Sequence, residues 1–230
     1  MDVQNASKDF IESNNLITKF VFIIGLLIVF LILLRFFISI GAWLFMASPT
    51  PHFTDGLNST DEGYMINVDP TKSGSKPVLR SVNEKEGLEF TYSIWLYIKG
   101  LDDPQNKNCI FRKGARAVKD GDETNAPGLY IQSANNEAHL SVKMDYYASE
   151  STTEGGAYGT EKIVDVKVPF RTWANVMIRC NGHNLDVLIN GILYSSKLLS
   201  GIPRQNYYDI EFSGGAAGGM VMIRFAIKPS

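Results

Sequence analysis

The pattern of apolar and polar positions divides the chain into one long apolar stretch and many short alternating ones. Residues 20–34 (FVFIIGLLIVFLILL) form an unbroken apolar run, bounded by Phe20 and Leu34, that has no counterpart later in the sequence. As a helix this run would be about 22 Å long, whereas the hydrocarbon core of a bilayer is roughly 30 Å thick. Extending it from Leu16 to Ile38 gives about 33 Å, so the pattern predicts one membrane-spanning helix.

Arg35 interrupts the apolar tract, which continues with residues 36–47 (FFISIGAWLFMA). In one interpretation the span ends near Ile38, Arg35 extends to the lipid headgroups, and Trp43 belongs to an interfacial segment. In the other, the helix continues, tilted, to the end of the tract and Arg35 pairs with a neighbouring protein. The first interpretation is favoured, because an arginine that reaches the headgroups needs no partner.

The segment before the apolar run argues against a cleaved signal peptide. Residues 1–15 are mixed in charge rather than short and basic, and Phe45 stands where a cleavage site before Ser48 needs a small residue. We therefore expect an uncleaved, single-pass anchor. It consists of an N-terminal tail (residues 1–15) followed by the transmembrane helix and its interfacial segment (residues 16–47).

The rest of the chain alternates between short apolar segments and turn signals. No amphipathic helix of useful length occurs, and segments of strand length cover residues 88–98, 109–112, 128–132, 138–144, 162–168, 173–180, 184–189, 192–195, 208–212 and 220–227. They predict an all-β fold, an antiparallel β-sandwich, over residues 87–230. Residues 48–86 are rich in Pro, Gly, Ser, Asp and Lys, which predicts a linker ending in a first edge strand near residues 77–82.

The sharpest local signal is the segment NLDVLINGILY, residues 184–194. Apolar residues alternate as far as Ile189, and Asn190 and Gly191 follow before a second apolar segment begins. Both residue types tolerate positive φ, which the two central positions of a type I′ turn require. This segment therefore predicts a two-residue β-hairpin.

Charge and cysteine content narrow the functional classes. The formal net charge is −2 and there is no basic run, so the electrostatic footprint of nucleic-acid binding is missing. Two cysteines, Cys109 and Cys180, are too few for a disulfide-dense secreted scaffold. They could form one bridge, but each lies in an apolar strand-like run, which favours buried free thiols.

Five segments together resemble, in order and spacing, the concanavalin A-like lectin/glucanase superfamily in its laminin G-like branch: FTYSIWLY (90–97), IFRKG (110–114), VPFRTWANVMIRC (168–180), LDVLING (185–191) and GMVMIRFAI (219–227). The resemblance implies a jelly-roll sandwich in which Trp173 packs beneath the sheet and Asn190 and Gly191 turn the hairpin. With Trp173 buried in this way, Trp173→Ala would cost about 3–5 kcal/mol.

Two further segments, residues 125–130 (NAPGLY) and 199–209 (LSGIPRQNYYD), are similar to a narrower group. This is the version of the domain that large DNA viruses of algae and protists encode behind one N-terminal membrane anchor. The resemblance implies a virion membrane or minor capsid-associated protein at the interface between inner membrane and capsid. Its partners would be the lipid bilayer and neighbouring capsid proteins.

Catalytic residues are not indicated. Glucanases of this superfamily place two glutamates and an aspartate on one strand, and no E-x-D-x-E pattern occurs here. Glu161 and Asp165 share a presumed strand without a third carboxylate, which favours solvated edge charges. His52, His139 and His183 are scattered and accompany no nucleophile or metal motif. We therefore expect a protein that is not an enzyme and has no cofactor.

Calcium is a weaker alternative, because many relatives bind it between loop carboxylates. Asp120, Asp122 and Asn125 cluster oxygen ligands, but the spaced loop with a terminal bidentate Glu is missing. Acidic stretches that contain Gly are usually solvated loops.

The candidate binding face consists of loop tyrosines: Tyr146, Tyr147, Tyr158, Tyr207 and Tyr208. Tyrosine rings stack on sugars and are equally common at protein interfaces, and ordinary loop packing is the alternative. Two functions follow. The favoured one is a non-catalytic structural protein that tethers a membrane to a protein shell, and the other is a membrane-anchored lectin that binds glycans.

Overall fold

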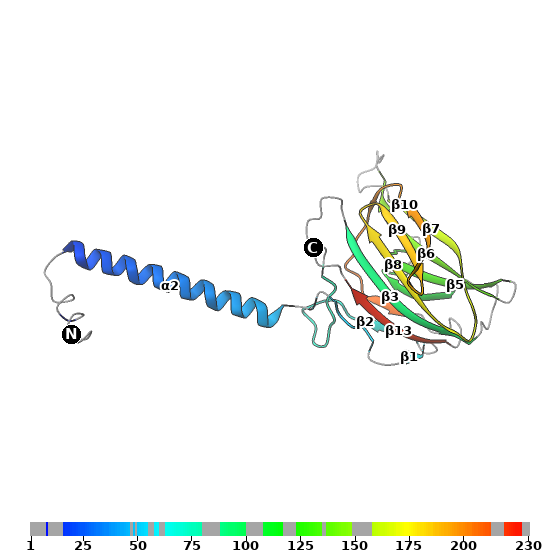
Figure 1. The fold of residues 1–230 in the computed structure, drawn as a ribbon, viewed down its shortest axis with the longest axis horizontal. Helices are drawn as coiled ribbons and strands as arrows, with labels where there is room; N and C mark the ends of the chain where they lie inside the picture. Colours follow the sequence, from blue (N-terminus) through cyan, green and yellow to red (C-terminus); the bar gives the residue numbers. More distant parts are fainter. Residues whose placement is uncertain are drawn as a thin grey trace. The chain divides into compact units, whose positions relative to one another are not determined.

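The computed structural model describes residues 8, 16–46, 48, 50–54, 58–59, 63–79, 88–99, 108–116, 123–134, 137–148, 158–212 and 219–226. The chain divides into two compact units, Met1–Met46 and Ala47–Ser230. The first contains one long helix and the second contains the β-strands (Figure 1).

Helix α2 (Leu16–Phe45) has 30 residues, and none of them is buried. By its length and composition it could cross a membrane. It continues unbroken through Arg35 as far as Phe45, and Trp43 belongs to it. Residues 39–45, which the favoured interpretation places in an interfacial segment, are thus helical. Residues 36–45 contain no proline that would end the helix earlier.

The second unit contains two antiparallel sheets, which confirms the predicted all-β class (Figure 1). The six-stranded sheet has the order β1 (Asn58–Ser59), β13 (Gly219–Ala226), β3 (Glu89–Ile98), β8 (Trp173–Asn181), β9 (Asn184–Ile189) and β10 (Ile192–Leu198). The seven-stranded sheet has the order β11 (Ile202–Pro203), β6 (Glu137–Tyr147), β5 (Gly128–Ala134), β4 (Asn108–Lys113), β12 (Ile210–Phe212) and β2 (Tyr64–Ile66), and β7 (Tyr158–Val168) pairs with β6.

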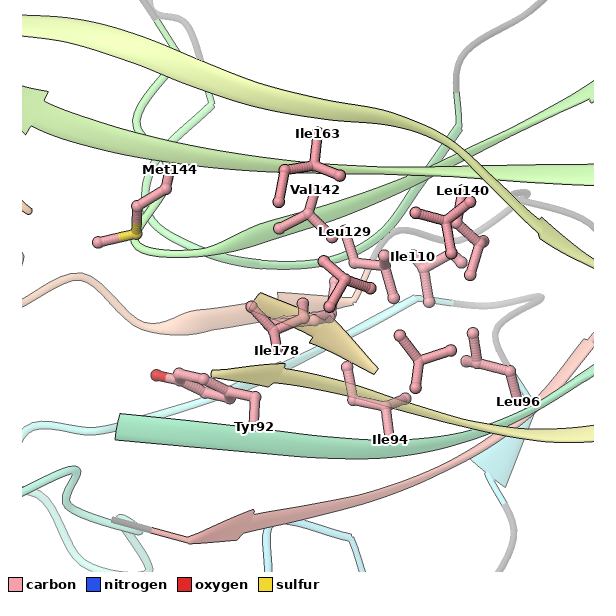
Figure 2. Close-up of a cluster of buried hydrophobic side chains, with 14 of the residues drawn as sticks. Tyr92, Ile94, Leu96, Ile110, Leu129, Leu140, Val142, Met144, Ile163 and Ile178 are labelled. Atoms are coloured by element: carbon pink, nitrogen blue, oxygen red, sulfur yellow. The ribbon is translucent and has the colours of Figure 1, made fainter. Parts of the chain in front are cut away.

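The core lies between the two sheets. Figure 2 shows Ile94 and Leu96 of β3 and Ile178 of β8 together with side chains from the other sheet, among them Leu129 and Leu140. Each strand contributes alternate residues because successive side chains point to opposite faces of a sheet. This alternation is why the strand positions could be predicted from the sequence.

The linker expected over residues 48–86 is wrong in part. Strand β2 pairs with β12, with Ile66 opposite Ile210, and Phe53, Ile66 and Val68 are buried in the core. The amide of Val68 donates to Asp209 Oδ1 at 3.0 Å. These apolar residues are separated by polar ones, so the stretch is polar on average while its few apolar side chains complete the sandwich.

The edge strand expected near residues 77–82 is not found in residues 77–79, and residues 80–82 lie outside the described ranges. The other predicted strands are present with small shifts at their ends. The two cysteines are free and lie in different sheets, Cys109 in β4 and Cys180 in β8, which confirms the prediction of free thiols.

The hairpin between β9 and β10 has the predicted turn. Ile189 pairs with Ile192, and the intervening Asn190 and Gly191 have φ angles of 50° and 83°. Asn190 Oδ1 also accepts the amide of Asn175 at 2.9 Å, which ties the turn to β8.

Gly191→Ala is expected to lower the free energy of unfolding by about 1–2 kcal/mol, because a side chain is disfavoured at this positive φ. A Cβ at Gly191 would meet no atom within 4 Å, so the cost comes from the backbone alone. Urea unfolding of both chains measures the difference. Gly191→Asn is the control and should cost less, since Asn tolerates this conformation. An alanine variant as stable as the parent would contradict the assigned turn.

Candidate functional site

The outer face of the six-stranded sheet, the side turned away from the core, carries the candidate site. In β3 the core side chains are Phe90, Tyr92, Ile94, Leu96 and Ile98. The alternate residues Thr91, Ser93, Trp95 and Tyr97 therefore share the outer face. Strand pairing then aligns residues of this face in four rows: Tyr97 with Trp173; Trp95 with Asn175; Ser93 with Met177, Leu188 and Leu193; and Thr91 with Arg179, Asp186 and Ser196.

Three aromatic side chains, Trp95, Tyr97 and Trp173, form what we call the aromatic platform. Trp95 is 41% exposed and Trp173 is 38% exposed. The rings of Tyr97 and Trp173 lie 5.4 Å apart between centroids, tilted by 47°. The sequence analysis missed Trp95 as a candidate and placed Trp173 beneath the sheet.

The expected burial of Trp173 is wrong, and the alternation of β8 explains why. Ala174, Val176 and Ile178 face the core, so Trp173 falls on the outer face together with Arg179. In β3, Trp95 has the same parity as the polar Thr91 and Ser93. In each strand the tryptophan alternates with apolar core residues, and this alternation was the signal in the sequence that could have identified both tryptophans as outward-facing.

Hydrogen-bonding groups border the platform. Asn175 is paired with Trp95 and is only 8% exposed. Its side-chain amide donates to Ser93 Oγ at 3.0 Å and to the carbonyl of Ile94 at 3.4 Å. These two hydrogen bonds hold the side-chain amide of Asn175 in one orientation beside the exposed indole of Trp95.

An oriented ion pair lies two rows further along. Asp186 accepts two bonds at Oδ2 from Arg179, from Nε at 3.0 Å and from Nη2 at 2.6 Å, and Oδ1 accepts Ser196 Oγ at 2.6 Å. The Asp186 side chain is 7% exposed, whereas that of Arg179 is 50% exposed. The carboxylate is saturated with donors, and it holds a solvent-facing guanidinium in place. Such a group suits ligand recognition better than proton transfer.

The predicted tyrosine face is only partly assembled. Tyr147 pairs with Tyr158 and with Ile202, so Tyr146, Tyr147 and Tyr158 lie at one end of the seven-stranded sheet. A Cβ at Gly159 would lie 2.4 Å from Tyr146 Oη, so the ring of Tyr146 occupies the space above that glycine. Tyr146 is therefore a packing residue.

Three other members of this face, Tyr147, Tyr207 and Tyr208, are open to solvent. Tyr147 is exposed, with the guanidinium carbon of Arg204 6.0 Å from its ring centroid. Tyr207 and Tyr208 are exposed in the segment between β11 and β12. Lys113 of β4 donates hydrogen bonds to the carbonyls of Asn206 and Tyr208 and so ties that segment to the sheet.

The calcium candidates do not form a site among the described residues. Asp120 and Asp122 lie outside those residues. Asn125 is buried; its Oδ1 accepts the hydroxyl of Tyr130 at 2.6 Å, and its amide donates to Asp145 Oδ2 at 2.8 Å. Within the described ranges no group of three or more His, Cys, Asp or Glu residues is placed to hold a metal ion.

Three of the residues considered for chemistry, Glu161, Cys109 and Cys180, are engaged or buried. Glu161 accepts Lys197 Nζ at 2.6 Å and Ser200 Oγ at 2.9 Å, and the bond from Lys197 holds the pKa of Glu161 below its usual range. The side chain of Asp165 lies outside the described part. Burial raises the pKa of Cys109 and of Cys180 to about 12, so neither thiol is primed as a nucleophile.

The sequence analysis also missed a buried charge network on the seven-stranded sheet. The side chain of Arg112 is 3% exposed and pairs with Glu123 and, at 2.6 Å, with Glu211. Arg116 also pairs with Glu211, and Lys143 Nζ lies 2.9 Å from Glu123 Oε2. Burial opposes ionisation of both glutamates, but hydrogen bonds from the cations outweigh it and lower their pKa. The network ties β4, β6 and β12 to the segment that contains Glu123.

No family model and no curated protein sequence matches this chain. Among solved structures, it is similar to the receptor-binding domain of botulinum neurotoxin type G, with 11% identity and a TM-score of 0.41 over 77% of this chain and 44% of that one. The ligand-binding domain of serotype D in complex with N-acetylneuraminic acid has 12% identity and a TM-score of 0.44 over 77% of this chain and 43% of that one. Trypanosoma rangeli sialidase in complex with 2,3-difluorosialic acid has 11% identity and a TM-score of 0.45 over 80% of this chain and 27% of that one. The chain thus spans less than half the length of these three proteins.

Proposed function

We propose that this chain is a non-catalytic, membrane-anchored binding protein whose sandwich binds carbohydrate on the outer face of the six-stranded sheet. The observation that carries the proposal is the aromatic platform, in which two tryptophans are exposed on a rigid sheet beside fixed polar groups. The exposed part of each indole gives up the stabilisation that its burial would provide. Sugar rings offer apolar faces for stacking and hydroxyl groups for hydrogen bonds, which match these two kinds of side chain.

The layout of the face supports a ligand longer than one sugar ring. Trp95 and Trp173 are diagonal neighbours on paired strands, a relation that corresponds to roughly 7–8 Å between their backbones. Arg179 lies four residues along β8 from Asn175, the residue opposite Trp95, which is about 13 Å along the strand. A linear glycan could therefore stack on the platform and reach the guanidinium of Arg179.

Anchoring and the absence of catalysis are parts of the same proposal. Helix α2 supports a membrane location, since its side chains are predominantly apolar and none is buried. A role without catalysis is supported by the sequence, in which the E-x-D-x-E pattern of the glucanases does not occur.

Trp95→Ala and Trp173→Ala are each expected to weaken glycan binding about tenfold, and the double variant more, because each removes one stacking surface. The ligand would first be found on a glycan array and its affinity then measured by calorimetry. Met65→Ala is the matched control, since Met65 is a 64% exposed apolar residue of the other sheet. The proposal fails if no glycan binds with or without calcium. It also fails if binding is lost in Tyr147→Ala and kept in the tryptophan variants.

The second candidate function is a tether between a virion membrane and its protein shell, as the resemblance to viral proteins implies. Met177, Leu188 and Leu193 extend the platform into an apolar strip, and Leu193 is 53% exposed. Aromatic residues, Met and Arg are enriched at protein interfaces. Cross-linking mass spectrometry on intact source particles separates the two functions. Reproducible links from the sandwich to one capsid protein, weakened by Leu193→Ser, would support the tether.

A further inference from the structure

The length of α2 exceeds what a membrane requires. Thirty residues make a helix of about 45 Å, while the hydrocarbon core is roughly 30 Å thick. At a tilt of about 40°, the upper end of the usual range, the helix would still extend about 34 Å along the membrane normal. Only part of α2 can therefore lie in the hydrocarbon, and the position of Arg35 bears on which part it is.

Arg35 allows two placements. If Arg35 lies at the headgroups, residues 36–45 leave the hydrocarbon, and the remaining apolar run of residues 20–34 covers only about 22 Å. Phe36, Trp43 and Phe45, which are exposed among the described residues, would then lie in the headgroup region or in water. If residues 36–45 lie in the hydrocarbon instead, Arg35 is about 15 Å from the helix end, which is too deep for its side chain to reach the surface.

Magnitudes favour a deep placement in which the helix is tilted. At a tilt of about 40°, residues 20–45 extend about 30 Å along the membrane normal, so residues 36–45 enter the hydrocarbon without displacing residues 20–34. Each large apolar side chain removed from water gains about 1.5–3 kcal/mol, and several such residues follow Arg35. An arginine near the centre of a membrane helix costs about 2.5–3.5 kcal/mol on insertion scales. The apolar segment therefore outweighs the arginine. A cationic side chain at this depth is stabilised by pairing with an acidic group within the membrane.

The sequence of α2 determines what kind of partner can supply that acidic group. The helix contains no Asp or Glu, so a second copy could offer only another Arg35 and would add repulsion. On the same face, one and two turns beyond Arg35, lie Ser39 and Ala42, whose small side chains allow a neighbouring helix to approach closely. We propose that α2 pairs, through Arg35, with a transmembrane helix of a different protein that carries an Asp or Glu. This inference rests on the membrane anchoring proposed above.

Site-specific photo-cross-linking of the full chain in the membranes of its source tests the pairing. A photoreactive residue at position 39, on the face of Arg35, should give one discrete adduct with another protein. The same residue at position 37, on a different face, should not give it. The adduct should fall at least tenfold in Arg35→Leu, persist in Arg35→Lys and be unchanged in Lys19→Leu, the control for loss of a flanking cation.

Each other result has a defined meaning. Adducts with lipid only, no adduct, an adduct with a second copy of the chain, or an adduct that Arg35→Leu leaves unchanged would overturn the pairing. Extraction of the parent membranes with alkaline carbonate separates this failure from failure of the anchor. A chain released into the supernatant contradicts membrane anchoring itself, whereas a chain retained in the membrane without the expected adduct contradicts only the partner.

Discussion

Arg112→Leu is expected to lower the free energy of unfolding by about 3–5 kcal/mol at neutral pH. Arg112 lies between Glu123 and Glu211, and removing it leaves two carboxylates with less compensation in a largely buried site. Loss of one partner from a buried ion pair is costly because the remaining charge stays desolvated. Urea unfolding followed by near-ultraviolet circular dichroism measures the difference.

The pH dependence identifies the cause. In the parent chain the pKa values of Glu123 and Glu211 are lowered, so their contribution to stability is present above about pH 4.3 and is lost as the pH falls through the folded values. In Arg112→Leu the pKa of each buried carboxyl should rise, so protonation relieves the unpaired charge. The stability gap between the two chains should therefore narrow between pH 7 and pH 4.5.

Arg116→Leu is the matched control, because Arg116 pairs with the same Glu211 while its own side chain is 65% exposed. An exposed partner of this kind should be worth about 1 kcal/mol or less. If Arg112→Leu lost the same free energy at both pH values, its cost would come from packing, and the electrostatic account would be wrong.

Phe111→Ala is expected to cost about 3–5 kcal/mol, since it would leave a cavity between the sheets. Phe111 is completely buried in β4, and its ring lies 5.7 Å from that of Tyr92 in β3 and 6.3 Å from that of Phe212 in β12. It therefore links both sheets. Thermal and urea unfolding should both show the loss.

Trp173→Ala provides the comparison, with an expected loss of about 1 kcal/mol because the ring is partly exposed on the outer face. Truncating the larger Trp173 should thus lower the free energy of unfolding less than truncating the smaller Phe111. A loss for Trp173→Ala as large as that for Phe111→Ala would return Trp173 to the core. It would also remove the basis of the aromatic platform.

The strands and the hairpin could be predicted because their information is local. Alternation of apolar residues identifies a strand, and Asn190 with Gly191 specifies a turn, without knowledge of any distant residue. Phe53, Ile66 and Val68 could not be found in this way. They lie in a stretch that is polar on average, and Ile66 is placed by the pairing of β2 with β12, a strand more than 140 residues later.

The candidate site was harder to predict for two reasons. The parity of Trp95 and Trp173 with polar neighbours was present in the sequence, but the family resemblance favoured burial of Trp173. The burial of Arg112 could not be predicted, because its partner Glu211 lies 99 residues away in the sequence. Networks of this kind become visible only when the strand order is known.

The pairing of β2 with β12 has a consequence for biosynthesis. Strands β12 and β13 are synthesised after all the other described strands, yet β12 separates β2 from β4, and β13 separates β1 from β3. Phe53 and Ile66 are made early and have no complete core to enter until this late segment emerges. The nascent domain therefore stays open for nearly its whole synthesis, and a chain truncated before Ile210 would expose apolar surface to chaperones and proteases.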